Sequence, residues 1–271
     1  HADHAALLDV PLLLGMTLSA YSDRHGAAAP FRCDVFPGRA GMLHGFVTYM
    51  TAKHKVLPKR KRLKLHGAWQ EAVAGVFWAH IVSENGEDTI PHDCAPMLLR
   101  TAFGSAGYSE HGAAWDHGAR RLEQAGLLAE ADDTAAWTVL HRQFAEYYAA
   151  CHLAARIAEA LKAGTTSLDV LLWDHARYTR LDYVTSMAVS IASSREHSGT
   201  VLPRVFGLLR EASAKDALEF LSLVGGREAA RMAAEVDEAP AAVARIMGRI
   251  GEDTAAQSLP RLLAHTDPVV R

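Results

Sequence analysis

Residues that could carry out chemistry are present in this sequence, but their spacing does not match a known catalytic motif. No glycine is followed by lysine, so there is no G-x-x-x-x-G-K-[ST] phosphate loop. A G-x-G-x-x-G helix start, a G-x-S-x-G nucleophile turn and an H-E-x-x-H metal motif are also missing. No apolar segment ends in the paired acids of a magnesium-binding strand. We therefore predict that this chain is not an enzyme and does not hydrolyse a nucleotide by itself.

Histidine and cysteine are the residues that could bind a metal, and their positions argue against a metal site. No carboxylate or thiol lies in register with the histidine pairs His1/His4, His111/His117 and His141/His152, so we interpret them as surface residues. The three cysteines are Cys33, Cys94 and Cys151, which are widely spaced and form no C-x-x-C pair. This usage predicts neither a zinc site nor a disulfide framework, and it favours a reducing, cytoplasmic location.

The composition is that of a folded globular protein. Of the 271 residues, 49% are apolar and 22% are charged, and the net charge is −3. This balance excludes disorder and gives no general reason to expect nucleic acid or an acidic membrane as a partner. The most apolar run, residues 5–21, contains Asp9 and Pro11, so we expect neither a membrane span nor a signal peptide. The chain starts without Met and stops within a helix start, so we expect a piece of a larger protein.

Hydrophobic periodicity and turn residues predict a mostly α-helical fold. Expected helices span residues 5–22 (broken near Pro11), 41–54, 63–82, 92–101 and 109–126, and residues 23–38 are expected to form a loop. After Gly126, an acidic turn and a return through Trp137 predict a small hairpin over residues 127–140 that contains the only strands. Three helices followed by a hairpin is the element order of a winged-helix unit.

The clearest helical pattern starts at Leu140. Apolar residues then recur at intervals of three and four up to Leu161, and neither Gly nor Pro interrupts the pattern before Gly164. Residues 167–193 are expected to form one or two further helices. From Val201, short Ala/Leu/Arg helices alternate with turns near residues 213–215, 225–226, 237–240, 251–254 and 266–268, which favours a stacked helical solenoid.

The expected architecture is therefore a helical domain plus a small winged-helix domain, followed by HEAT-like α-solenoid repeats. We place the helical domain at residues 1–62, the winged-helix domain at 63–150, a second helical domain at 151–200 and the truncated repeats at 201–271.

Two segments resemble a known family. Residues 8–16, LDVPLLLGM, resemble the "N-P-L-L-L-x-M-L" helix that follows the ATPase core of NACHT-type STAND NTPases. Residues 139–150, VLHRQFAEYYAA, resemble the "F-L-H-x-[ST]-F-Q-E-Y-F-A-A" helix at the end of the winged-helix domain of that family. The chain departs from the patterns at Val10, where Asn is common, and at Ala145, where Gln is common. The phosphate loop, the magnesium-binding strand and the sensor arginine of the family would all lie before residue 1.

The resemblance implies a nucleotide role for two residues. In the family, the proline of the helical domain touches adenine and the winged-helix histidine reaches the β-phosphate of ADP. The matching positions here are Pro11 and His141. The alternatives from the residues alone are a helix kink in a core for Pro11 and a buried histidine at a strand–helix junction for His141. Arg142 and Glu146 are expected to hold the helix end rather than to act in catalysis.

The function implied is that of a regulatory and sensor segment of a NACHT-family signal-transduction NTPase. It would keep an upstream NTPase core in a closed ADP state, sense a protein or nucleic-acid trigger through its repeats, and allow oligomerisation on activation, in defence or regulation. ADP or ATP would bind the full-length parent and not this chain tightly by itself. Two other functions stay open. One is a winged-helix DNA-binding regulator that uses residues 109–126 as its recognition helix, although Glu110, Asp116 and Glu123 make that helix acidic. The other is a helical-repeat scaffold for protein interactions.

Overall fold

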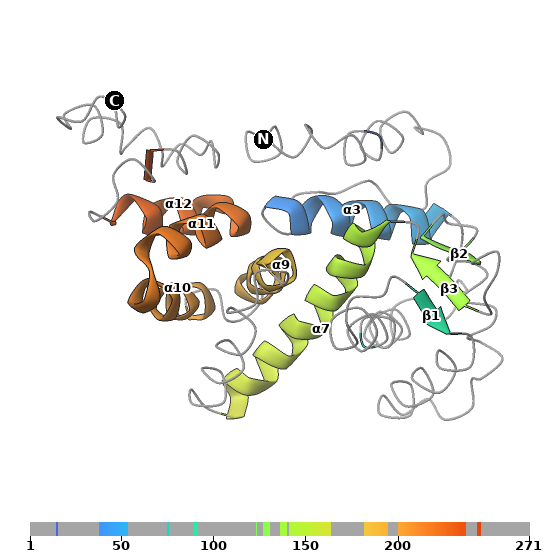
Figure 1. The fold of residues 1–271 in the computed structure, drawn as a ribbon, viewed down its shortest axis with the longest axis horizontal. Coiled ribbons are helices and arrows are strands. Elements are labelled where there is room, and N and C mark those ends of the chain that lie inside the picture. The colour runs from blue at the N-terminus through green and yellow to red at the C-terminus, as the bar shows by residue number, and fades with distance from the viewer. Residues whose placement is uncertain are drawn as a thin grey trace. The chain divides into compact units, whose positions relative to one another are not determined.

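The computed structural model describes part of the chain. The described residues are 15, 38–53, 75, 89–91, 123, 127–130, 136–139, 141–163, 182–194, 200–236 and 243–244. Among them, helices dominate and one small sheet is present, as the composition predicts (Figure 1). The helices are α3 (Gly38–Lys53), α7 (Arg142–Ala163), α9 (Asp182–Ser193), α10 (Val201–Ala212), α11 (Ala214–Val224) and α12 (Gly226–Ala234).

The described residues belong to two compact units. One contains the first turn of α3 up to Met42, α7 from Ala154 onward, and α9 to α12. The other contains α3 from Leu43, the sheet, and α7 as far as Leu153. The four domains expected from the sequence stay a prediction.

The sheet contains the expected hairpin and one strand more than expected. Strands β2 (Leu128–Glu130) and β3 (Ala136–Val139) pair antiparallel, with Leu128 opposite Val139. The prediction that the hairpin holds the only strands is wrong, because β1 (Thr89–Pro91) pairs antiparallel with the other edge of β3. The order is therefore β1-β3-β2. Proline has no N–H to donate, and within this sheet Pro91 lies in an edge strand, where such a residue is tolerated.

Helix α7 follows β3 closely and has the length that the sequence predicts. It spans 22 residues and ends immediately before Gly164. Every residue from Phe144 to Ala150 is buried, whereas Arg156, Glu159 and Lys162 in the second half are exposed. The segment from Phe144 to Ala150 is therefore enclosed by protein, and the later turns are amphipathic.

Helix α11 contacts each of the three helices α9, α10 and α12 (Figure 1). Residues Val184 to Ala192 of α9 are all buried, within the range 167–193 where one or two helices were expected. Helix α9 also packs against α10. Because α9 is enclosed on all faces, its Thr and Ser side chains are buried with its apolar ones.

The turns between α10, α11 and α12 lie where the sequence predicts them. Ser213 separates α10 from α11, and Gly225 separates α11 from α12. The Ser213 hydroxyl accepts the N–H of Asp216 at 3.2 Å, so one extended residue ends a helix and caps the next. The solenoid itself stays a prediction, because the later turns near residues 237–240, 251–254 and 266–268 lie outside the described residues.

Other expectations also lie outside the described residues. These are the helix over 5–22 (apart from Gly15), the loop over 23–38 (apart from Gly38, which begins α3), and the helices over 63–82, 92–101 and 109–126 (apart from Gly75 and Glu123). Within the described ranges, no helix combines the length and apolar character needed to cross a membrane.

Candidate functional site

Of the two predicted nucleotide contacts, Pro11 and His141, only His141 lies among the described residues. Pro11 lies outside the described residues. His141 is described, and it lies between the end of β3 and the start of α7 with its side chain exposed. The interpretation of His141 as a buried junction histidine does not fit this exposure. The imidazole is therefore available for contact with a group outside the described part of the chain.

Backbone geometry fixes His141 at the start of α7. Its carbonyl accepts the N–H of Phe144 at 2.9 Å, which closes the first turn of the helix. The first N–H groups of any α-helix have no partner within the helix, and the helix dipole places partial positive charge there. The first turn of α7 carries no acidic residue that would neutralise this charge. An exposed imidazole and a positive helix end thus lie together, an arrangement that favours an anionic ligand.

Arg142 and Glu146 form an ion pair on the first turns of α7. Nε of Arg142 donates to Oε1 of Glu146 at 3.0 Å. The Arg142 side chain is 58% exposed, whereas that of Glu146 is 10% exposed. A carboxylate buried to this degree needs a charged partner or hydrogen bonds. The pair therefore agrees with the expectation that both residues hold the helix end.

A contact that the sequence analysis missed positions these first turns. His44 of α3 and Tyr147 of α7 approach to 2.7 Å between Nδ1 and the hydroxyl oxygen, and the two rings are tilted by 56°. Near this contact, the rings of Phe46 and Phe144 stack with centroids 5.8 Å apart. The partners are far apart in sequence, so the only available signal was the aromatic content of the segment around Tyr147. These contacts fix the side of α7 that follows His141.

Tyr148 lies beside this cluster and is buried. Burial raises the pKa of its phenol, and the charge of neighbouring Cys151 raises it further. The ring of Tyr148 also lies 5.7 Å from that of Tyr147, measured between centroids. Tyr148 therefore stays neutral over the physiological range and contributes packing rather than acid–base chemistry.

The chemistry that this arrangement offers is anion binding. In the described part of the chain, no group of three or more His, Cys, Asp and Glu residues is placed to hold a metal ion. At the start of α7, the features that could contact a phosphate are the His141 imidazole and the adjoining helix terminus. Because Nε of Arg142 bonds to Glu146, this arginine is directed along the helix toward a carboxylate.

The chain matches no protein-family model, no curated protein and no solved structure with which it was compared.

Proposed function

We propose that the chain is the regulatory and sensor segment of a NACHT-type STAND NTPase, in which His141 contacts the β-phosphate of ADP bound to an upstream core. The observation that carries the proposal is the exposed His141 at the positive end of α7, directly before a helix whose sequence resembles the motif of the family. An exposed imidazole at this place can reach a phosphate on another module, which a core histidine cannot do.

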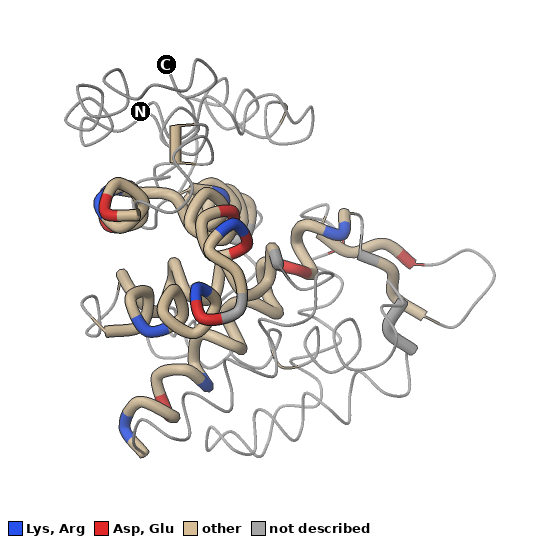
Figure 2. The backbone as a smooth tube through the Cα atoms, turned by 60° about the vertical axis from the view of Figure 1, so that its left-hand side comes forward, with Lys and Arg blue, Asp and Glu red and all other residues tan. Residues whose placement is uncertain are grey.

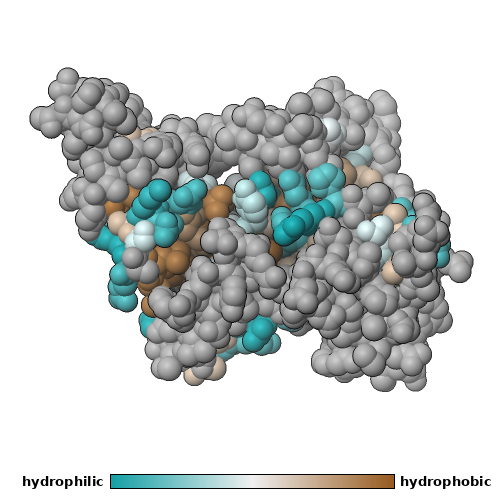
Figure 3. Space-filling view, viewed as in Figure 1, coloured by the Kyte–Doolittle hydropathy of each residue, from teal (hydrophilic) through white to brown (hydrophobic). Residues whose placement is uncertain are grey.

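Two features of the fold support the proposal. The strand order is β1-β3-β2, and the hairpin of β2 and β3 leads into α7, as expected for the end of a winged-helix unit. The consecutive helices α10, α11 and α12 pack as neighbours, as the helices of a repeat array do. Apolar surface is visible over α10 and α11 in Figure 3, and Leu208, Leu209 and Leu223 are the half-buried leucines of these two helices. The repeats are accordingly proposed to bind the trigger, a protein or a nucleic acid.

The energy available from His141 suits a switch. A hydrogen bond from an imidazole to a charged phosphate contributes about 1.5–3 kcal/mol. Such a contact, when present only in a closed ADP state, favours that state over an open one by one to two orders of magnitude. Loss of the contact would favour the open, oligomerising form of a cytoplasmic defence or regulatory protein.

The test is His141→Ala in the full-length parent protein. The expected result is an ADP release rate about ten- to a hundredfold faster, together with signalling or assembly without a trigger. The melting temperature should stay close to that of the unaltered protein, because the replaced side chain is exposed. Thr200→Ala is the matched control, since Thr200 is an exposed residue before α10 whose side chain makes no capping bond.

An ADP release rate unchanged by His141→Ala would overturn the assignment of His141. A lowered melting temperature with unchanged ADP release would make His141 structural. A reading frame without a Walker motif upstream of His1 would remove the NTPase proposal altogether.

A DNA-binding winged-helix regulator is the alternative, and the sheet order is compatible with it as well. The described residue of its recognition helix, Glu123, is exposed and acidic, which disfavours contact with phosphates. Helices α7, α10, α11 and α12 each carry both basic and acidic residues, so none of these four is of a single charge sign (Figure 2). The described residues therefore favour the sensor over the DNA-binding regulator. No described feature separates the sensor from a plain scaffold except His141.

A further inference from the structure

The first turn of α3 lies against the turn between α11 and α12, and the two backbones touch (Figure 1). A Cβ atom on Gly38 would lie 3.0 Å from the carbonyl oxygen of Val224, closer than side chains normally come to a backbone oxygen. A Cβ atom on Gly225 would lie 3.6 Å from Cα of Gly38. Both glycines have positive φ, 60° and 71°, where other residues are strained. Only glycine at both places allows this contact without strain.

A second contact holds the same turn of α3. The guanidinium carbon of Arg39 lies 4.0 Å from the centroid of the Tyr183 ring at the start of α9. Tyr183 is 42% exposed, so this cation–π contact lies at the solvent edge and is correspondingly weak. Apart from these contacts, the turn buries the side chains of Ala40 and Met42.

Helix α9 of the same unit buries more side chains than these turns do: all residues from Val184 to Ala192 are buried, whereas the two turns bury Ala40, Met42 and Val224. Ile191 of α9 and Leu218 and Leu221 of α11 have no exposed surface. Segments that bury few apolar side chains open at lower free energy than segments in the core. The first turn of α3 and the α11–α12 turn are therefore expected to separate before α9 unfolds.

We propose that these two turns form a glycine latch, defined by Gly38, Arg39, Val224 and Gly225, which opens as one cooperative unit while α9 stays folded. Helix α3 is continuous from Gly38 to Lys53, so opening of the latch frees one end of a helix that also contributes to the second unit. A ligand on α11 or α12 that prefers the open latch would shift the population toward it. This use in sensing a trigger rests on the proposed function, whereas the latch itself does not.

Native-state hydrogen exchange on the 271-residue chain, without nucleotide and at low denaturant, measures the opening directly. The reporters are the N–H of Leu43, which in an α-helix bonds to the carbonyl of Arg39, and the N–H of Gly225, which donates to Leu221 at 3.0 Å. Both should exchange through the same opening reaction. The free energy of that opening should be lower, and should depend less on denaturant, than the free energy of the opening reported by Ile191. The latch would be overturned if either reporter had the same opening free energy as Ile191. It would also be overturned if the two reporters had different opening free energies.

Gly38→Ala tests the coupling. The strain of a non-glycine residue at this φ should accelerate exchange at Leu43 and at Gly225 about tenfold, and leave Ile191 unchanged. Gly207→Ala is the matched control, because Gly207 lies within α10 and its added Cβ meets nothing within 4 Å. That variant should not accelerate exchange at either reporter. Faster exchange at Leu43 alone, or equally at Ile191, would contradict the proposal.

Arg39→Gln covers the case in which Gly38→Ala does not fold. It removes the cation over Tyr183 without changing the backbone, and exchange at both reporters should rise about threefold. An unchanged rate at Gly225 in this variant also counts against the latch. These measurements need no nucleotide, so their outcome is separate from that of His141→Ala in the parent protein.

Discussion

At the scale of single residues, Tyr148 links burial to an effect of pH. Tyr148 belongs to α7 and its side chain is buried. This burial raises the pKa of the phenol above its ordinary value of 10.0. In the unfolded chain, the phenol ionises near that ordinary value. The folded state binds the proton more tightly, so the stability it confers is complete below pH 10 and is lost as the pH rises above it.

The first prediction therefore concerns alkaline stability. Above pH 10, the free energy of unfolding should fall with a contribution from Tyr148 of about 1.4 kcal/mol per pH unit. Tyr148→Phe should remove this contribution, and urea unfolding between pH 9 and pH 11 measures the slope. An equal slope in Tyr148→Phe and the unaltered chain would show that the tyrosine ionises in the folded state as it does in water.

Single residues also show how much of the candidate site the sequence can predict. The position of His141 before a helix followed from the motif and the periodicity, and α7 starts at the next residue. Its exposure was left open, because His141 was interpreted both as a surface histidine and as a buried junction histidine, and burial depends on which parts of the fold pack beside the junction. The contact of His44 with Tyr147 was missed for the same reason, since it joins α3 to α7 across a large sequence separation.

At the scale of elements, Ser213 is the clearest case of local sequence determining structure. It lies between α10 and α11, and its N–H donates to the carbonyl of Leu209 at 2.9 Å while its own carbonyl accepts from Ala217 at 3.0 Å. Its hydroxyl accepts from Asp216, and the acidic Asp216 lies near the positive end of α11. Serine and aspartate three residues apart are a common signal for a helix start, which is why this turn could be predicted.

The second prediction tests this cap. Ser213→Ala should lower the free energy of unfolding by about 0.5–2 kcal/mol, because the N–H of Asp216 loses its acceptor. Denaturant unfolding followed by circular dichroism gives the value. Ser222→Ala, in the same helix, is the matched control: its hydroxyl donates to the carbonyl of Glu219, which is a local bond within the helix. Alanine favours a helix, so that variant should be neutral or slightly stabilising. Equal effects of the two substitutions would mean that the capping bond adds no stability.

Helix α7 shows where periodicity is an incomplete guide. The expected stripe from Leu140 to Leu161 includes Phe144, Tyr147 and Ala154, which are buried. Cys151, Ala158 and Leu161 are only half-buried, whereas Leu153 and Ile157 have no exposed surface. The spacing therefore predicts the helix and its length correctly, but it places the buried face of the second half incorrectly. Several faces of this helix carry apolar residues, and the packing of other helices decides which one is covered.

Strand β1 was missed because its sequence gives almost no signal. Thr89, Ile90 and Pro91 are too few to show alternation, and a proline argues against a strand. Its pairing with β3, with Ile90 opposite Trp137, is a long-range contact. The hairpin of β2 and β3 could be predicted because its two strands and its turn are close in sequence.

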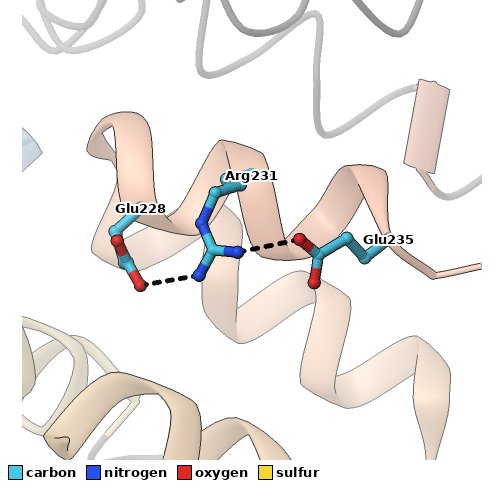
Figure 4. Close-up of polar contacts among 3 residues, drawn as sticks. All are labelled: Glu228, Arg231 and Glu235. Carbon is cyan, nitrogen blue, oxygen red and sulfur yellow. Dashed lines mark hydrogen bonds and ion pairs between the residues drawn. The ribbon is translucent and has the colours of Figure 1, made fainter. Parts of the chain in front are cut away.

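The exposed face of α12 carries two ion pairs, both formed by Arg231. Arg231 donates to Glu228 at 3.1 Å and to Glu235 at 2.8 Å (Figure 4). The hydrogen bond and charge of Glu228, together with those of Glu235, raise the pKa of the guanidinium. Because all three side chains are well exposed, salt screens these pairs and they contribute little to stability. The packing of Ala229, Ala230 and Ala233 therefore holds α12 in place.

At the scale of the whole molecule, α3 and α7 are each divided between the two compact units. Of the expected domain boundaries, those after residues 62 and 200 lie outside the expected helices, whereas the one after residue 150 lies within the helix expected from Leu140. Turn residues mark the ends of helices in a sequence, but a helix that contributes to two units carries no such mark. A change in one unit can therefore alter a helix that also contributes residues to the other unit.

The third prediction concerns the chemistry of the chain as a whole. The 271-residue chain should bind ATP or ADP weakly or not at all, and should release no phosphate from ATP above background. Catalysis of phosphoryl transfer depends on a phosphate-cradling loop and metal ions that position and neutralise the transferred group. The sequence contains no such loop. One imidazole contact of about 1.5–3 kcal/mol is far below the roughly 8 kcal/mol that micromolar affinity requires.

Isothermal titration with ADP and a steady-state phosphate assay on the purified chain check this third prediction. The His141→Ala variant is the internal control, because any weak heat of binding that depends on the proposed contact should disappear with the imidazole. Sustained phosphate release by the unaltered chain would require a catalytic site that neither the motifs nor the described residues indicate. Micromolar binding that survives His141→Ala would place a nucleotide site elsewhere on the chain. Either result would mean that this segment binds or hydrolyses the nucleotide by itself. The sensor proposal would then fail, because it assigns nucleotide binding and hydrolysis to an upstream core.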